Sequence, residues 1–328
     1  MTKGFIAVIG VGGTISMTHG PAGLTPTQSA TDILRVVAAE HDGVAFQPID
    51  LMRKASASMT LDDVYTLARA LDDLAAQGAA GIVVTQGTDT LEEVAFAVEL
   101  LSEAPIPIVF TGAMRGASAL GYDGGANLAD AIRVALYAKG RGEVFVVMNG
   151  EAHTPRWVTK AHTSSLAAFM SPSFGPLMNL HESKVHEVAR IPRAPKIAVE
   201  RPSAWPRVAL IQLGLDDDCR LLPHLKTIGY EGCVLAAAGA GHVGDFAMDA
   251  IAQTVAHMPI VLCSRTGAGR ICEQTYAYAG GEIDLLQRGV IPAKNLSPVK
   301  ARLVLSLCAA MGPPNTGEAF VCIADALT

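Results

Sequence analysis

The sequence predicts an α/β protein with a larger N-terminal domain, built on a mainly parallel sheet flanked by helices, and a smaller C-terminal α/β domain. Short apolar runs of strand length alternate with longer segments of helical periodicity, which is typical of α/β folds. A proline-rich stretch interrupts this alternation after residue 190. The length of 328 residues also exceeds that of one simple domain.

The N-terminal part begins with a strand-like run and continues as alternating strands and helices. Thr60–Ala76 predicts a helix because Thr60 can cap its start, Asp62 and Asp63 suit the positive first turn, and leucines recur at helical spacing. Gly78 then ends this helix. Further helices are predicted at Leu91–Leu101 and Asn127–Tyr137, and strands at Phe5–Val11, Val44–Ile49, Gly81–Thr85, Ile106–Thr111 and Val144–Met148.

The stretch VARIPRAPKIAVERPSAWPR contains four prolines, which remove backbone donors and discourage regular structure. We therefore expect a linker at residues 191–206, between an N-terminal domain of residues 1–190 and a C-terminal domain of residues 207–328. The second domain is predicted to contain strands near Val208–Leu213, Cys233–Ala237 and Ile260–Cys263, and helices near Phe246–Ala256 and Pro298–Ala310.

The composition excludes several classes of protein. Half of the residues are hydrophobic and 17% are charged, a balance that excludes a disordered chain. The apolar runs have strand length, whereas a membrane-spanning helix needs about 20 residues, so we expect no membrane insertion. A net charge of −6 gives no electrostatic reason to bind nucleic acid.

Neither the cysteines nor the acidic residues predict a metal site. The six cysteines fall in the C-terminal third without a CxxC pair, which favours buried, reduced thiols. The acidic run Asp216–Asp218 is interpreted as a solvated loop. The N-terminus MTKGFIAVIG enters a strand without the segments of a secretory signal, so we expect a cytoplasmic protein.

The first candidate motif is the glycine-rich turn IGVGGTIS at Ile9–Ser16. A dinucleotide-binding GxGxxG counted from Gly10 would need glycine at Ile15, which argues against a nucleotide-dependent dehydrogenase. The glycines instead present Thr14 just beyond the carboxyl end of a strand, where open α/β sheets bind ligands. Alternatively, the motif is only a tight turn whose hydroxyl bonds to its own backbone.

The second motif is TQGTDT at Thr85–Thr90, which follows a buried strand and precedes a helix. Helix capping explains one hydroxyl or carboxylate there, but it does not require the whole polar cluster. The start of a helix also supplies donors for a substrate carboxylate.

The third motif is WVTKAHT at Trp157–Thr163. Most lysines are solvated surface residues, and Lys160 alone fits that interpretation. A desolvated lysine near a threonine hydroxyl can instead accept its proton, with an aspartate to orient it.

Together with TGAMRG at Thr111–Gly116, DGGANL at Asp123–Leu128 and the SP-FGPL pattern within Ser171–Leu177, these motifs resemble the bacterial-type L-asparaginase and glutaminase-asparaginase family. They occur in the family's order over most of the first 180 residues. SRTGAGR at Ser264–Arg270 and PVKARLVL at Pro298–Leu305 extend a looser likeness over nearly the whole chain.

The resemblance implies a two-domain asparaginase-like fold and an amidohydrolase that converts L-asparagine, or glutamine or a related small ω-amide, to the acid and ammonia without metal or organic cofactor. Thr14 would be the nucleophile, and Thr88, Asp89 and Lys160 would form a second catalytic cluster. A homotetramer of intimate dimers is also implied. The substrate-binding residues carried over by motif are Ser56, Ala57, Gly87, Thr88, Asp89 and Ala113.

This chain departs from the family pattern in the loop after the first motif. The family has a tyrosine there that bonds to the nucleophilic threonine, but Met17–Ser29 contains none. The sequence leaves five substitutes open: Thr25, Thr27, His19, Tyr122 and Tyr276.

The residues expected to recognise the substrate also differ. Ala57 stands where a glutamine usually follows the binding serine, Gln86 replaces a histidine, and Ala240 replaces an asparagine. An alternative to the enzyme is therefore a catalytically weakened homologue that binds an amino acid as a sensor.

Overall fold

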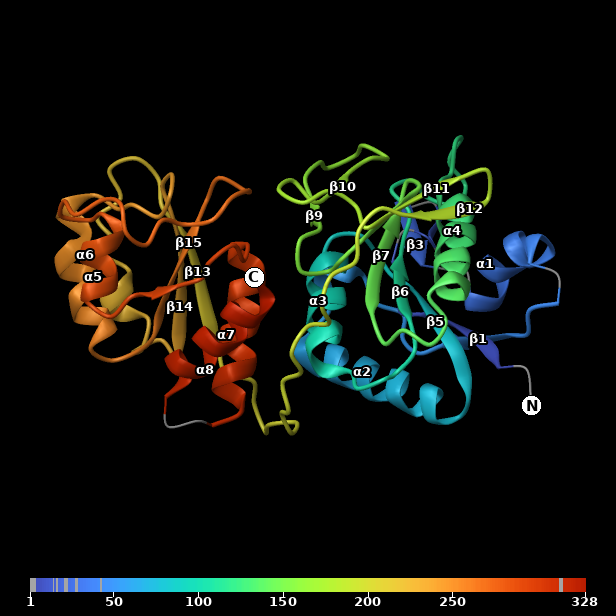
Figure 1. Ribbon diagram of the computed structural model, residues 1–328, viewed down its shortest axis with the longest axis horizontal. Helices are drawn as coiled ribbons and strands as arrows, with labels where there is room; N and C mark the ends of the chain where they lie inside the picture. The colour runs from blue at the N-terminus through green and yellow to red at the C-terminus, as the bar shows by residue number, and fades with distance from the viewer. Residues whose placement is uncertain are drawn as a thin grey trace. The chain divides into compact units, whose positions relative to one another are not determined.

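The structure, a computed structural model, describes residues 4–13, 15, 17–20, 23–26, 29–41, 43–312 and 315–328; of these, the side chains of residues 17–20, 23–26, 36 and 38 are not described. The chain divides into two units, Met1–Lys196 and Ile197–Thr328 (Figure 1).

The first unit is built on an eight-stranded sheet with the order β12-β11-β8-β7-β6-β5-β1-β4. Strands β4, β1, β5, β6 and β7 run parallel, whereas β8, β11 and β12 pair antiparallel. Two small hairpins, β2–β3 and β9–β10, lie outside this sheet. The bounds of the strands are β1 Phe5–Gly10, β2 Met17–Gly20, β3 Gly23–Pro26, β4 Phe46–Asp50, β5 Ala79–Thr85, β6 Ile108–Thr111, β7 Val144–Met148, β8 Glu151–His153, β9 Thr159–Lys160, β10 Phe169–Met170, β11 Met178–His181 and β12 Lys184–Glu187.

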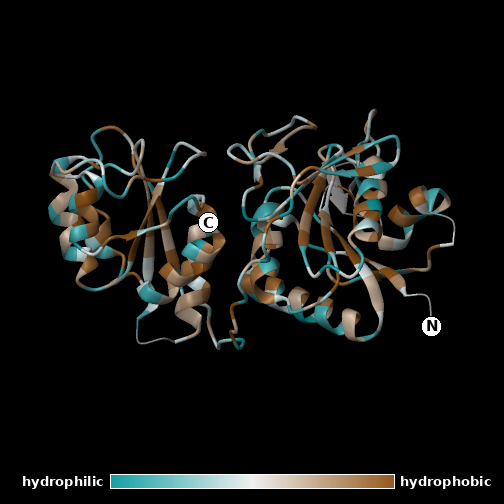
Figure 2. Cartoon of the chain, in the orientation of Figure 1, coloured by the Kyte–Doolittle hydropathy of each residue, from teal (hydrophilic) through white to brown (hydrophobic). Residues whose placement is uncertain are grey.

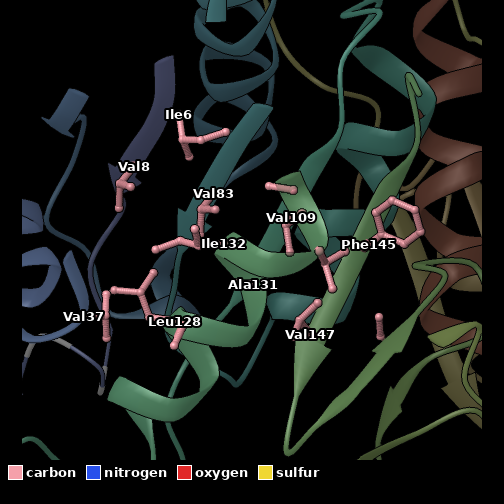
Figure 3. Close-up of a cluster of buried hydrophobic side chains, with 14 of the residues drawn as sticks. Ile6, Val8, Val37, Val83, Val109, Leu128, Ala131, Ile132, Phe145 and Val147 are labelled. Carbon is pink, nitrogen blue, oxygen red and sulfur yellow. The ribbon is translucent and has the colours of Figure 1, made fainter. Parts of the chain in front are cut away.

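Helices cover both faces of this sheet (Figure 1). α1 (Ala30–Val37) and α4 (Gly124–Tyr137) pack on one face, and α2 (Leu61–Ala76) and α3 (Leu91–Leu101) pack on the other. Figure 3 shows the core between the parallel strands and α4, where Val83, Val109 and Ile132 are fully buried. The strands are hydrophobic along their length in Figure 2, as expected for parallel strands covered on two faces.

The local signals in the sequence explain how α2 begins and ends. The Thr60 side chain accepts from the Asp63 backbone N–H, and the Asp63 carboxylate accepts from Thr60 in return, forming a capping box. After the helix, Gly78 adopts a positive φ of 95°, which a residue with a side chain rarely adopts.

The second unit contains a four-stranded parallel sheet in the order β13-β14-β15-β16. α7 packs on one face of the sheet with α8 against it, and side chains of α5 and α6 join the hydrophobic core on the other face. The bounds are β13 Val208–Gln212, β14 Gly232–Ala237, α5 Met248–Val255, β15 Ile260–Ser264, α6 Glu282–Gln287, β16 Ile291–Pro292, α7 Pro298–Ala310 and α8 Thr316–Leu327.

The predicted fold class is confirmed, and the differences lie in boundaries and short elements. β6 begins at Ile108 rather than Ile106, since Pro107 has no N–H to donate. α4 begins at Gly124 rather than Asn127, because two glycines weaken the helical signal of its first turn. Several elements were not predicted from the sequence: α1, α6, α8, the hairpin β2–β3 and the short strands β8–β12 and β16.

The predicted linker residues carry no regular element: no helix or strand lies between Glu187 and Val208. The first part of this stretch belongs to the first unit. Arg156 donates to the Pro192 carbonyl, and Lys196 donates to the Glu99 carbonyl. The division between the two units falls after Lys196.

The cysteines are mostly buried, as predicted, with one clear exception. Cys219, Cys233, Cys263 and Cys308 are buried, Cys272 is partly buried, and Cys322 is exposed. Cys322 lies on α8, which buries Phe320, Ala324 and Leu327 instead, so its outer face reaches solvent. In the described part of the chain, no helix is both long and apolar enough to cross a membrane.

Candidate active site

Three of the predicted motifs meet at one edge of the larger sheet. Gly10 of β1 pairs with Thr85 of β5, and Thr85 pairs with Thr111 of β6, so these parallel strands end side by side. The hydrogen bonds continue beyond the strands, from the Val11 N–H to the Thr85 carbonyl at 3.1 Å and from the Gln86 N–H to the Thr111 carbonyl at 3.0 Å. The edge therefore collects polar groups from segments that are distant in the sequence, as at the carboxyl ends of other open α/β sheets.

The two glycine turns that follow β1 and β5 are in direct backbone contact. Gly13 has a φ of +96°, and a Cβ built on it would lie 1.9 Å from the Gly87 nitrogen and 2.0 Å from the Gly87 Cα. A side chain at position 13 would force the turns apart. The structure thus explains both glycines by close approach of backbone.

The turn after β5 places Thr88 and Asp89 directly before α3. The helix N-cap is Thr90, and its side chain makes no capping hydrogen bond. The Thr88 hydroxyl and the Asp89 carboxylate bond instead to Lys160 and Ser56. Helix capping therefore does not account for this polar cluster.

Lys160 joins the cluster from hairpin β9–β10. Its Nζ donates to Thr88 Oγ1 at 2.9 Å and to Asp89 Oδ1 at 3.1 Å. The Lys160 side chain is 17% exposed, whereas that of Asp89 is 61% exposed. The ammonium is shielded while the carboxylate faces solvent, which suits Asp89 to meet a charged solute.

Ser56 holds Asp89 from a short 3-10 helix at Ser56–Ser58. The Ser56 hydroxyl donates to Asp89 Oδ2 and accepts from the Asp89 N–H, both at 3.1 Å. The Ser56 carbonyl accepts from Thr90 Oγ1 at 2.7 Å. The next predicted binding residue, Ala57, is exposed to solvent.

The third strand end lies against Thr88. A Cβ built on Gly112 would lie 2.6 Å from the Gln86 carbonyl oxygen and 3.2 Å from Thr88 Cγ2. The side chain of Ala113, the next residue, is fully buried in the hydrophobic core. The structure therefore brings the turns of Gly87, Thr88 and Ala113 together.

The predicted nucleophile Thr14 lies outside the described residues, as does Thr27; the side chains of His19 and Thr25 are also not described. Tyr122 is described, and its hydroxyl donates to the carbonyl of Ile15, the residue after Thr14, at 3.0 Å. Tyr276 lies in the second unit, edge-on to His242 at a centroid distance of 4.7 Å.

Sequence reasoning missed Glu92, a carboxylate in the first turn of α3. Its Oε1 accepts from Thr159 Oγ1 and from the Lys160 backbone N–H, both at 3.1 Å. Glu92 is only 8% exposed. A glutamate in the first turn is also favoured by the helix dipole alone, so the sequence carried no separate signal for this contact.

The histidines near Lys160 have structural environments. His153 Nδ1 lies 3.1 Å from Ser171 Oγ, and burial lowers the pKa of its ring to about 4, so the ring is neutral near pH 7. His162 accepts the N–H groups of Ser164 and Ser165 in an exposed loop. Within the described residues, no group of three or more histidine, cysteine or acidic side chains is arranged to hold a metal ion.

Comparison with known proteins matches both parts of the chain to one family. Residues 5–192 match the family model "Asparaginase, N-terminal", and residues 207–317 match "Glutaminase/Asparaginase C-terminal domain". A probable L-asparaginase of Deinococcus radiodurans is 37% identical over 323 residues, covering 94% of this chain and 93% of the relative. One component of the glutamyl-tRNA(Gln) amidotransferase of Methanosarcina barkeri is 30% identical, covering 89% of this chain and 71% of the relative.

A solved structure shows the same architecture. The crystal structure of a probable cytoplasmic L-asparaginase from Campylobacter jejuni superposes with a TM-score of 0.86 at 28% identity, covering 99% of this chain and all of that one. The matched models span both units, and the polar cluster of Thr88, Asp89 and Lys160 lies in the first of them. The chain therefore belongs to the asparaginase family of amidohydrolases.

Proposed function

We propose that this protein hydrolyses the side-chain amide of L-asparagine to aspartate and ammonia, with Thr14 as the nucleophile. The observation that carries the proposal is the contact of Lys160 Nζ with both Thr88 Oγ1 and Asp89 Oδ1 beside the turn that carries Gly13. A shielded ammonium held between a hydroxyl and a carboxylate is suited to moving a proton next to a reacting group.

The reaction proceeds in two steps of acyl transfer. The Thr14 oxygen adds to the amide carbon, its proton passes to the leaving nitrogen, and the carbon–nitrogen bond breaks to release ammonia. Water then adds to the ester carbon, returns one proton to Thr14 and releases the free carboxylic acid. Thr88 and Lys160 carry the proton in both steps, so neither is changed after a full cycle.

Asp89 and Ser56 bind the amino-acid part of the substrate in this proposal. Asp89 offers a solvent-facing carboxylate to the α-ammonium group, and the Ser56 hydroxyl that now bonds to Asp89 contacts the α-carboxylate. The Ala113 carbonyl accepts from the leaving amide nitrogen. Backbone N–H groups around Thr14 and Thr88 bind the developing oxyanion, an interaction that typically contributes about 10²–10³-fold to kcat.

The test is ammonia release from L-asparagine, L-glutamine and their D-isomers. Thr14→Ala and Thr88→Ala should each abolish release from the preferred substrate. Thr66→Ala is the matched control, because the Thr66 hydroxyl bonds to the Asp62 carbonyl of its own helix at an exposed position and should keep full activity. No ammonia from a broad panel of amides would refute the enzyme and favour the amino-acid sensor, which predicts thermal stabilisation by ligand without turnover.

Location and assembly are part of the same proposal. A cytoplasmic homotetramer built from intimate dimers is supported by the likeness to the probable cytoplasmic L-asparaginase of Campylobacter jejuni and by the family motifs. Light scattering coupled to gel filtration measures the assembly, and a monomer at micromolar concentration would refute it. Cell fractionation measures the location.

A further inference from the structure

The backbone on both sides of Thr14 is fixed by contacts that use no part of Thr14 itself. On one side, Gly13 lies against the backbone of Gly87. On the other, Ile15 is fully buried in the core between the sheet and α4. The Ile15 carbonyl accepts a hydrogen bond from the hydroxyl of Tyr122, at 3.0 Å and from 107 residues further along the chain.

Tyr122 is itself held by the residues around it. The neighbouring Asp123 carboxylate accepts the N–H groups of Met114 and Arg115, each at 2.9 Å, and the Asn127 amide at 3.0 Å. These bonds fix the start of α4 against the turn after β6. The phenol is thus presented from a rigid part of the fold.

Gly124 leaves room for the phenol. A Cβ built on Gly124 would lie 2.2 Å from the Tyr122 hydroxyl oxygen and 2.3 Å from the ring carbon that bears it. Any larger residue at position 124 would displace the ring from Ile15. The pair Tyr122–Gly124 therefore works as one device that directs a hydroxyl to this carbonyl.

The protonation state of the phenol indicates which role it can play. Burial, with a smaller contribution from the Asp123 carboxylate, raises the pKa of Tyr122 to about 12. The hydroxyl therefore stays protonated across the physiological range and acts as a donor. It is a poor proton acceptor for Thr14 at neutral pH.

We propose that Tyr122 is a positioning residue for catalysis, whose hydroxyl holds the Ile15 carbonyl and so fixes the backbone that follows Thr14. This inference rests on the proposed function of Thr14. It gives this chain, which lacks a tyrosine between Met17 and Ser29, a different tyrosine that acts through the backbone of the same turn.

The test compares Tyr122→Phe with Tyr137→Phe. Both replacements remove one tyrosine hydroxyl from α4 or its N-terminal flank; Tyr137 bonds to Glu187 at an exposed site 3.1 Å away. Tyr122→Phe should lower kcat about tenfold with KM within about twofold, because a small displacement of a reacting group is costly. The pH dependence of kcat should keep its midpoint, and Tyr137→Phe should leave kcat unchanged.

Three results would overturn the inference. An unchanged kcat with a lower Tm would make Tyr122 a purely structural residue. A rise in KM alone would make it a substrate-binding residue, and a shifted pH midpoint would make it a proton carrier. If the wild-type protein releases no ammonia, hydrogen exchange gives an independent readout: Tyr122→Phe should accelerate exchange in the peptide spanning residues 12–20, and equal rates in both variants would refute the positioning role.

Discussion

Replacing Gly13 by alanine tests whether the two glycine turns must touch for the site to form. The added Cβ would lie 1.9 Å from the Gly87 nitrogen, where ordinary contacts need about 3.5 Å, so the turns must separate by roughly 1.5 Å. The positive φ of Gly13 costs alanine about 1–2 kcal/mol, and forcing the packed turns apart costs about 1–3 kcal/mol more. Gly13→Ala should therefore lower the free energy of unfolding by roughly 2–5 kcal/mol.

Gly78→Ala is the matched control for this replacement. Gly78 has nearly the same φ, 95° against 96°, but no atom lies within 4 Å of a Cβ built on it. It should lose only the conformational part, about 1–2 kcal/mol, and keep kcat. The difference between the two variants in urea unfolding isolates the cost of the close approach.

Activity provides the second readout. Because a displacement of about 1 Å can cost 10²-fold in rate, Gly13→Ala should lower kcat for ammonia release by about that factor. A Gly13→Ala enzyme within threefold of wild-type kcat would refute the reasoning. Equal losses in the Gly78→Ala control would do so as well.

Three further predictions follow from single contacts. Glu92→Ala should lower kcat about 10–100-fold by releasing the backbone of Lys160, whereas Glu92→Gln keeps an accepting oxygen and should lose less; equal losses would contradict this. His153 has a pKa of about 4 when folded against about 6.5 when unfolded, so the unfolded state binds more protons between these values and stability should fall by up to about 3 kcal/mol as pH drops from 6.5 to 4. His153→Gln should flatten that part of the curve, measured by urea unfolding at each pH; an unchanged slope would assign it to other groups. Arg156→Met should cost about 3–5 kcal/mol because it removes the ion pair of the buried Glu99 carboxylate, whereas Arg220→Met, at an exposed pair, should cost about 1 kcal/mol or less; similar costs in chemical denaturation would contradict the distinction.

The sequence predicted the elements whose signals are local. The helix at Leu61–Ala76 has a cap, a periodic apolar face and a terminating glycine within its own residues, and its start and end agree with the prediction to one residue. β8 is three residues long and exists because β7 and β11 supply its partners. Such a strand has no pattern of its own to detect.

The candidate site divides in the same way. TQGTDT and VTK were identified from their residues and their resemblance to a family, and the structure places Lys160 against Thr88 across 72 positions of sequence. Glu92 and Tyr122 contribute through contacts with backbone groups 68 and 107 residues away. The side-chain type alone does not predict such contacts, because any carboxylate or phenol can make them once the fold brings it near.

The identity of the nucleophile tests the central proposal most directly. The enzyme should be mixed with L-asparagine, quenched with acid before the first turnover is complete, digested and analysed by mass spectrometry. We predict one β-aspartyl ester on the peptide that contains Thr14, and no ester on that peptide in Thr14→Ala. An ester on the peptide that contains Thr88, or ammonia release at an unchanged rate from Thr14→Ala, would contradict the account.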